Sequence, residues 1–414
     1  MFKKWSILML VCLGINAFVP VANRVFMRYH SIKVDGSDLP PVERSGVDLQ
    51  IDRRVVLFTL LTGAKGCDAS TKQPSALEGK EGGFQLTVPL KMSPSGTAYL
   101  VYYRIDGSLF RAILDTGSPF LMIPGSCGEK IRAQYGCYIQ SKGLGEPSGL
   151  EETVEIYDGR EGPVEWRRAG FTFENATGDP ELLESVKSVV FGVVSDRLIA
   201  SPGGVFFGLV RDADSRIRPS FLGQTNVAAF GINLASTPRT LTLSTAPLVV
   251  DDFVPLTTVL RRRFGDPSGH YTAQAKGVTV NGVPLGARDK KPIYVIVDTG
   301  VTGMVVDQAL FDERFATARR RREGNLWGHV VVSFKTSLGH TLEVTARKPI
   351  CTPVSALPWK GFEKSCHLVV IGLSFLEGTR LSVDIDRNRL WIEDGDGGGG
   401  QSNEYLIPKT RLFS

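Results

Sequence analysis

The chain has 414 residues, of which 42% are hydrophobic and 22% are charged, so global disorder and collagen-like repeats are excluded. No apolar run reaches the roughly 18 residues that a membrane-spanning helix needs, which excludes a multi-pass membrane protein. The net charge is +5, but residues 1–69, with nine basic and six acidic residues, account for +3 of it, so no nucleic-acid partner is expected.

The N-terminal region has the features of an export signal. Residues 1–17 contain two lysines, a mostly apolar run over 5–15 and Ala17 at a plausible cleavage point, which is the order of a secretory signal peptide. An uncleaved signal anchor is the alternative. Further on, Arg53-Arg54 precedes a short apolar run and resembles a twin-arginine export signal. Residues 18–83 are therefore predicted to be a transit or second signal, or else a propeptide. The chain is expected to enter the secretory pathway, with plastid or thylakoid-lumen routing and vacuolar or secreted routing both open.

From about residue 84 the sequence is typical of β structure. Asp106-Gly107 separates two runs of β-branched and aromatic residues, at 99–105 and 109–114, which predicts a hairpin. Similar runs recur at 153–157, 169–173, 188–194, 204–210, 240–243, 293–297, 329–334 and 341–345. Helical patterns are short, around 181–187, 219–224 and 307–320. The predicted fold class is all-β with short helices.

An internal repeat carries the functional signal. Ile-Leu-Asp-Thr-Gly at 113–117 is matched by Ile-Val-Asp-Thr-Gly at 296–300, and each copy lies between two apolar segments. A second element, two or more apolar residues and a glycine, ends at Gly208 and at Gly372, 93 and 74 residues past the two aspartates. One such triplet is weak evidence, since Asp-Thr-Gly also suits a turn at a strand end. A turn alone does not explain the duplicated context.

Two carboxylates that meet at an interface between related halves have a specific chemistry. Like charges at close range push the two pKa values apart, so the pair Asp115 and Asp298 would share one proton over a wide pH range. The ionised carboxylate can take a proton from a water molecule while the protonated one polarises a carbonyl group. This chemistry needs no metal, no cofactor and no covalent intermediate.

Residues 84–393 resemble the pepsin-like aspartic proteases, the bilobal A1-type family. The resemblance implies two pseudo-twofold-related β-barrel lobes, at 84–245 and 246–393, followed by a Gly-rich linker and flexible tail at 394–414. It places Asp115 and Asp298 on the two catalytic aspartates of the family. The strongest match is the segment from Phe110 to Pro124.

The resemblance also implies roles for neighbouring residues. The threonines of the two triplets would hydrogen-bond across the lobes, the glycines would permit the tight turns, and Ser118 would support Asp115. A hairpin at 155–159 matches the flap that closes over the substrate, with Tyr157 as its tyrosine. The expected supporting residues are Thr116, Gly117, Ser118, Thr299, Gly300 and Thr302, and the expected flap residues are Tyr157, Asp158 and Gly159.

One position departs from the family pattern. The residue after the second triplet is usually Ser or Thr, but here it is Val301. A hydroxyl that would stabilise an ionised Asp298 is missing, unless Thr302 supplies it. Because hydrogen bonds to a carboxylate favour its charged form, Asp298 should ionise less readily and the pH optimum should be less acidic than is usual for the family.

The body contains four cysteines in two local pairs. Cys127 and Cys137 form one pair, and Cys351 and Cys366 form the other. An exported chain favours disulfides. Metal binding is the alternative, but neither pair has CxxC spacing and no histidine cluster accompanies them. Two disulfides and no metal site are therefore predicted. The first pair also matches a small disulfide loop of the family.

The leading hypothesis is an aspartic-type endopeptidase that binds an extended polypeptide between its lobes as a monomer. The main alternative is a catalytically inactive pepsin-fold protein that binds or inhibits another protein. A noncatalytic β-sandwich or barrel receptor leaves the duplicated motif unexplained.

Overall fold

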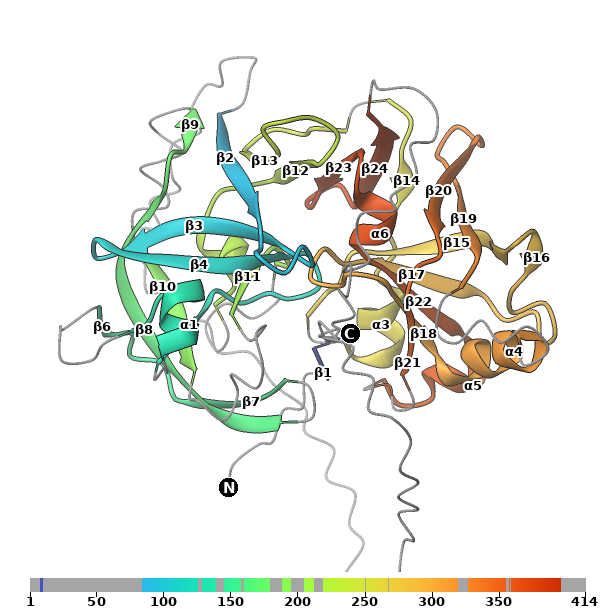
Figure 1. The fold of residues 1–414 in the computed structure, drawn as a ribbon, viewed down its shortest axis with the longest axis horizontal. Helices are drawn as coiled ribbons and strands as arrows, with labels where there is room; N and C mark the ends of the chain where they lie inside the picture. Colours follow the sequence, from blue (N-terminus) through green and yellow to red (C-terminus); the bar gives the residue numbers. More distant parts are fainter. Residues whose placement is uncertain are drawn as a thin grey trace, which may run out of the picture. The chain divides into compact units, whose positions relative to one another are not determined.

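The computed structural model describes residues 8–9, 84–125, 129–138, 145–157, 160–178, 188–194, 205–211, 219–249, 251–266, 268–318, 327–354, 357 and 359–395. This part of the chain is mainly β with short helices, which confirms the predicted class (Figure 1). No helix in these residues has both the length and the hydrophobicity to cross a bilayer. Almost all of the predicted signal, the 18–83 region and the predicted tail lies outside the described residues.

The first sheet combines strands from the beginning and the end of the body. Its main path runs β1-β7-β8-β3-β2-β13-β12-β23-β24-β14. The bounds are β1 (Leu8–Met9), β2 (Gln85–Met92), β3 (Tyr99–Ile105), β4 (Ser108–Asp115), β5 (Met122–Pro124), β6 (Glu146–Pro147), β7 (Thr153–Tyr157), β8 (Arg160–Phe173), β9 (Thr177–Gly178), β10 (Ser188–Val194), β11 (Phe206–Gly208), β12 (Ala229–Asn233), β13 (Thr240–Ser244), β14 (Val254–Pro255), β23 (Thr379–Asp384) and β24 (Arg389–Asp394). The antiparallel pairing of β12, from the middle of the body, with β23 adds the last strands of the body to this sheet.

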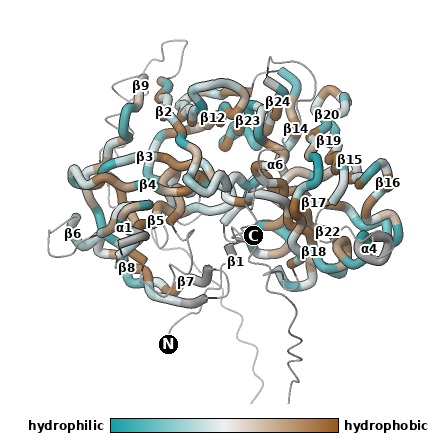
Figure 2. Tube along the Cα trace, in the orientation of Figure 1, coloured by the Kyte–Doolittle hydropathy of each residue, from teal (hydrophilic) through white to brown (hydrophobic). Residues whose placement is uncertain are grey.

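The second sheet lies wholly in the later half of the chain, in the order β20-β19-β15-β17-β22-β18-β21, with β16 paired to β15. Its bounds are β15 (Thr272–Val280), β16 (Val283–Pro284), β17 (Ile293–Val297), β18 (Met304–Asp307), β19 (His329–Lys335), β20 (Thr341–Arg347), β21 (Cys351–Val354) and β22 (His367–Ile371). Hydrophobic segments dominate where β17, β18 and β22 lie side by side (Figure 2). Every residue of β17 and β22 is buried, and apart from His367 at the start of β22 the two strands consist of hydrophobic residues.

The helices are α1 (Glu129–Tyr135), η2 (Leu222–Gln224), α3 (Val259–Phe264), α4 (Gln308–Ala318), α5 (Phe362–Ser365) and α6 (Leu373–Leu376). The predicted helical pattern at 307–320 corresponds to α4, whereas the pattern at 219–224 forms only the 3-10 turn η2. The pattern at 181–187 lies outside the described residues. Each of the ten predicted strand runs overlaps a strand, and the run at 99–105 matches β3 from end to end, whereas only Phe206–Gly208 of the run at 204–210 forms a strand, β11.

The internal repeat is also a repeat in three dimensions. Strand β4, which ends at Asp115, pairs in parallel with β11, and β17 pairs in parallel with β22. Each Asp-Thr-Gly strand therefore lies beside the strand that leads to the second glycine. A Cβ on Gly208 would lie 2.4 Å from the Ser118 carbonyl oxygen, and one on Gly372 would lie 2.1 Å from the Val301 carbonyl oxygen. Glycine is required at both positions because the turn after each triplet passes directly over it.

The predicted disulfide between Cys351 and Cys366 is not formed, and both residues are buried thiols. The strand register explains why. Cys351 and Ile371 both align with Met304 on β18, whereas Cys366 precedes the opposite end of β22. Five residues along a strand span about 17 Å, but a disulfide needs Cα atoms within about 7 Å. Because Cys127 lies outside the described residues, its pairing with Cys137 stays a prediction.

This correction is testable by thiol chemistry. Alkylation of the unfolded chain without a reductant should label Cys351 and Cys366, because no covalent bond protects them. Peptide mapping by mass spectrometry gives the positions. A peptide in which these two residues are disulfide-linked would contradict the fold described for this half of the chain.

Candidate active site

The two aspartates occupy equivalent buried positions. Asp115 is the last residue of β4 and Asp298 follows β17, with 4% and 2% of their surfaces exposed. In each loop the glycine two residues later donates its backbone N–H to the Oδ1 atom of the aspartate, over 2.7 Å from Gly117 and 2.8 Å from Gly300. Each carboxylate is therefore oriented by its own loop in the same way.

The two carboxyl groups lie against each other. They share a side-chain hydrogen bond. A Cβ on Gly117 would lie 2.3 Å from Oδ2 of Asp298, and one on Gly300 would lie 2.8 Å from Oδ1 of Asp115. Each glycine thus borders the opposite aspartate. Any side chain at these positions would push the carboxyl groups apart, which is the physical reason for glycine in both triplets.

The two groups do not share the negative charge equally. Burial raises the pKa of Asp298 well above its ordinary value, and the charge of Asp115 and its hydrogen bond raise it further. Burial also raises the pKa of Asp115, but the hydrogen bond from Asp298, the N–H of Gly117, the hydroxyl of Ser118 and the charge of His270 lower it again. The hydroxyl of Ser118 and the charge of His270 favour the ionised form of Asp115 and have no counterpart at Asp298, so we expect Asp115 to ionise first and Asp298 to keep the shared proton.

Thr116 and Thr299 link the two loops through four hydrogen bonds. The backbone N–H of Thr116 donates to Oγ1 of Thr299 over 3.1 Å, and the N–H of Thr299 donates to Oγ1 of Thr116 over 3.0 Å. Each hydroxyl then donates to a carbonyl of the opposite strand, over 2.8 Å to Val297 and 2.7 Å to Leu114. Both side chains are 1% exposed, so water does not compete for these bonds. The relative position of the two carboxyl groups depends on this link.

The residues after the two triplets differ. Ser118 is fully buried, and its hydroxyl lowers the pKa of Asp115. Its Oγ atom is not aligned for a regular hydrogen bond with any group in the described part of the chain. The equivalent Val301 is also fully buried, in an apolar cluster with Ile296, Val305 and others. Asp298 thus has an apolar neighbour where Asp115 has a hydroxyl.

Thr302, the other possible source of the missing hydroxyl, donates its hydroxyl proton elsewhere. Its Oγ1 donates over 2.8 Å to the carbonyl of Thr97, in the loop before β3. The chain turns Val301 into the apolar cluster, so the next side chain points to the opposite half of the protein. Thr302 therefore connects the two halves and leaves Asp298 with backbone donors, the N–H groups of Gly300 and Val301.

The predicted flap corresponds to the hairpin of β7 and β8. Tyr157 is the last residue of β7, and its backbone pairs with Arg160. Asp158 and Gly159 lie outside the described residues. Trp166 on β8 anchors the base of the hairpin: its Nε1 donates over 3.0 Å to Thr153, and its ring packs edge-on against Phe120, three residues after Gly117, at 5.4 Å. The hairpin is thus connected directly to the loop of Asp115.

Two charged residues beside the site were missed by the sequence analysis. Nδ1 of His270 lies 2.8 Å from Oδ2 of Asp266, and both side chains are buried. A sequence signal did exist, because Asp-Pro-Ser-Gly-His at 266–270 matches Ser-Pro-Ser-Gly-Thr at 93–97. It is a second internal repeat, and the two copies differ at their first and last residues.

In comparisons of the whole chain with known proteins, no family model matches it and no curated protein is significantly similar to it. The assignment of a function therefore depends on the residues of the site and their geometry.

The threonine link predicts a specific loss of stability. Thr299→Val keeps the shape of the side chain but leaves the Thr116 N–H and the Leu114 carbonyl without their partner. Each unsatisfied buried group should cost roughly 1–3 kcal/mol of unfolding free energy. Urea denaturation measures the change, and Thr299→Ser, which keeps the hydroxyl, is the control. Equal stability of the Val variant and the unchanged protein would contradict the role given to this link.

Proposed function

We propose that this chain is an aspartic endopeptidase with a pepsin-like bilobal body, its lobes at about 84–245 and 246–393. The observation that carries the proposal is the meeting of two Asp-Thr-Gly loops from the two halves of the chain. Reciprocal threonine hydrogen bonds join the loops, and the buried carboxyl groups share a hydrogen bond. A pair of turns with no chemical role would not need two desolvated carboxyl groups in contact, since their burial is costly.

The asymmetry of the pair assigns the roles. Ionised Asp115 accepts a proton from a water molecule, whose oxygen forms a bond to the carbonyl carbon of the peptide. Protonated Asp298 gives its proton to the carbonyl oxygen, so a neutral tetrahedral diol forms. In the second step Asp115 passes its proton to the amide nitrogen, the C–N bond breaks, and Asp298 recovers a proton from a diol hydroxyl. The pair returns to its starting state.

The substrate class in this proposal is an extended polypeptide. The hairpin of β7 and β8 would act as the flap, because Trp166 connects its base to the segment that follows Asp115. Tyr157 is the flap residue proposed to lie over the substrate. No metal or cofactor takes part in the proposed reaction.

The decisive test is proteolysis by the purified protein. Hydrolysis of an unfolded protein between pH 3 and 7 should be blocked by pepstatin. Asp115→Asn and Asp298→Asn should each lower kcat by about 10²- to 10⁴-fold, the usual contribution of a general acid or base. Asp312→Asn, at an exposed position of α4, is the matched control and should keep full activity. Tight peptide binding without hydrolysis at any pH would favour an inactive binding protein instead.

The apolar Val301 beside Asp298 should affect the pH above which activity is lost. The reaction requires protonated Asp298, so activity is lost as pH rises through the pKa of this group. Val301→Thr would add a hydroxyl that stabilises the ionised form of Asp298. The alkaline limb of the kcat/KM profile should then move about one pH unit lower, which corresponds to one hydrogen bond to a charged group.

Val301→Ala is the control for this shift, because it changes the packing without adding a hydroxyl. Its alkaline limb should stay in place. An alkaline limb that is identical in the Thr variant and the unchanged protein would contradict the explanation.

A further inference from the structure

We infer that His270, held by Asp266, is a positioning residue whose positive charge favours Asp115 over Asp298 as the ionised member of the catalytic pair. This inference rests on the proposed function and adds a determinant outside the two Asp-Thr-Gly loops.

The imidazole of His270 is fixed in place. Asp266 accepts hydrogen bonds from the backbone N–H groups of Ser268 and His270, over 3.2 and 3.3 Å, so its carboxylate is itself locked. This carboxylate holds Nδ1 of the ring at 2.8 Å, and Trp359 packs edge-on against the ring at 6.0 Å. Only 8% of His270 is exposed. A buried carboxylate at this distance favours the imidazolium form.

The segment that carries His270 is attached to the chain that follows β11, which is bonded to Asp115. The hydroxyl of Tyr271, the next residue, donates over 2.6 Å to the carbonyl of Leu209. The N–H of Leu209 in turn donates over 2.8 Å to the carbonyl of Asp115. The charge of Asp115 and the backbone of Gly117 both favour the protonated ring of His270. The hydrogen bonds from Tyr271 to Leu209 and from Leu209 to Asp115 attach the His270 segment to the loop of one aspartate only.

The internal repeat gives His270 a neutral counterpart in the other half of the chain, Thr97. His270 follows a glycine of positive φ and lies two residues before the start of β15. Thr97 likewise follows a glycine of positive φ and lies two residues before the start of β3. Each segment reaches the Asp-Thr-Gly loop of the other half: His270 meets the loop of Asp115, and Thr97 accepts the hydrogen bond of Thr302. The equivalent of the Asp266 carboxylate is the hydroxyl of Ser93, which accepts weak bonds from Thr97 and Ala98. One loop therefore faces a cation and the other a neutral group.

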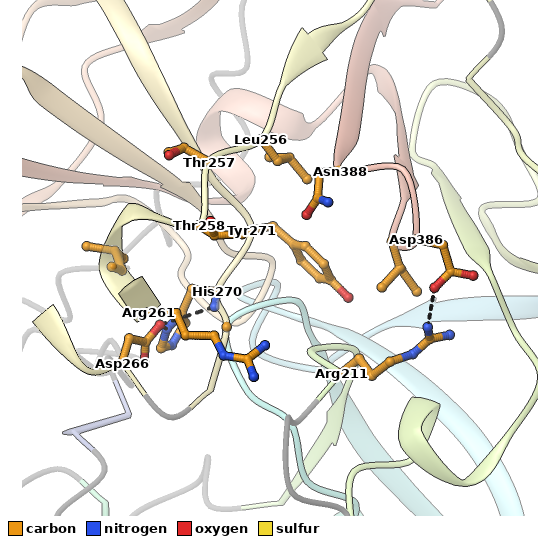
Figure 3. A pocket seen from close by; sticks show the side chains of 13 residues that line it. Arg211, Leu256, Thr257, Thr258, Arg261, Asp266, His270, Tyr271, Asp386 and Asn388 are labelled. Atoms are coloured by element: carbon orange, nitrogen blue, oxygen red, sulfur yellow. Dashed lines mark hydrogen bonds and ion pairs between the residues drawn. The ribbon is translucent and has the colours of Figure 1, made fainter. Parts of the chain in front are cut away.

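The other charged groups near His270 do not cancel this effect. Besides Asp266 and Asp115, three charged residues lie near His270: Arg211 after β11, Arg261 on α3 and Asp386 between β23 and β24. Together with Asp266 and His270 they line a pocket of about 220 Å³ (Figure 3). Arg211 is paired with Asp386 over 2.5 Å, and Arg261 belongs to an exposed turn of α3.

The titration behaviour agrees with this geometry. Burial lowers the pKa of His270, but the charge and hydrogen bond of Asp266, and then the charge of Asp115, raise it above its ordinary value. Burial raises the pKa of Asp266, yet the charge of His270 and the three hydrogen bonds lower it to about 2. His270 is thus protonated across the acid range, where it lowers the pKa of Asp115.

The inference is tested by measuring kcat/KM against pH on the acid side, where activity falls as Asp115 becomes protonated. His270→Gln removes the charge and keeps an amide that can donate, so the pKa of Asp115 should rise. The acid limb should move up by about one pH unit, which is a tenfold loss of kcat/KM on that side, with little change in kcat at the optimum. Asp266→Asn should shift the limb in the same direction, because burial then lowers the pKa of His270.

His340→Gln is the matched control, since His340 pairs with Asp252 over 2.9 Å but is exposed. Its profile should equal that of the unchanged protein, and circular dichroism should show that all three variants are folded. An unmoved acid limb in folded His270→Gln would overturn the inference and leave the proposed function intact.

NMR titration of the unchanged protein gives a second measurement that needs no variant at His270. The imidazole signal of His270 should titrate above the ordinary histidine pKa and show an additional small step when Asp115 ionises. A signal that titrates below the ordinary value would overturn the inference. If no hydrolysis occurs at any pH, the proposed function fails, whereas the NMR steps still decide whether His270 senses Asp115.

Discussion

The four hydrogen bonds by which Thr116 and Thr299 join the two loops, two between the threonines and two to the Val297 and Leu114 carbonyls, are the constraint on which the site depends. They make each loop a hydrogen-bond partner of the opposite strand, so neither carboxyl group can be displaced without disturbing the other half of the protein. The burial of two acidic groups is unfavourable by itself. It is maintained because the backbone of both loops is satisfied by this link and because one proton is shared between the carboxyl groups.

The approximate symmetry of the halves is broken at two places, with different consequences. Asp115 is followed in its loop by the buried hydroxyl residue Ser118, whereas the equivalent residue in the loop of Asp298 is the buried, apolar Val301. The two loops also differ in the residue that reaches them from the other half of the chain. This residue is His270 for the loop of Asp115 and Thr97 for the loop of Asp298. Both differences favour charge on Asp115 and a proton on Asp298. A symmetrical scaffold thus holds two chemically distinct carboxyl groups, which is the requirement for general acid and base roles at one centre.

Much of this arrangement could be predicted from the sequence, because the relevant signals are local. The strands have runs of β-branched and aromatic residues, and Asp115 and Asp298 share a triplet with matching flanks. The direction of Thr302 could not be predicted, since it depends on which way a tight turn faces the core. The separation of Cys351 from Cys366 depends on strand register, and the role of His270 depends on contact between distant segments.

The order of strands in the first sheet has a consequence for how the chain must fold. Strands β12 and β13, from the middle of the body, pair with β2 on one side and with β23, almost 150 residues later, on the other. Contacts of such long sequence separation make folding slow, because a large loop must close before they form. During synthesis the edge of β12 stays unpaired until β23 has emerged. We therefore expect this edge to be the part of the nascent chain most exposed to misassembly with another copy.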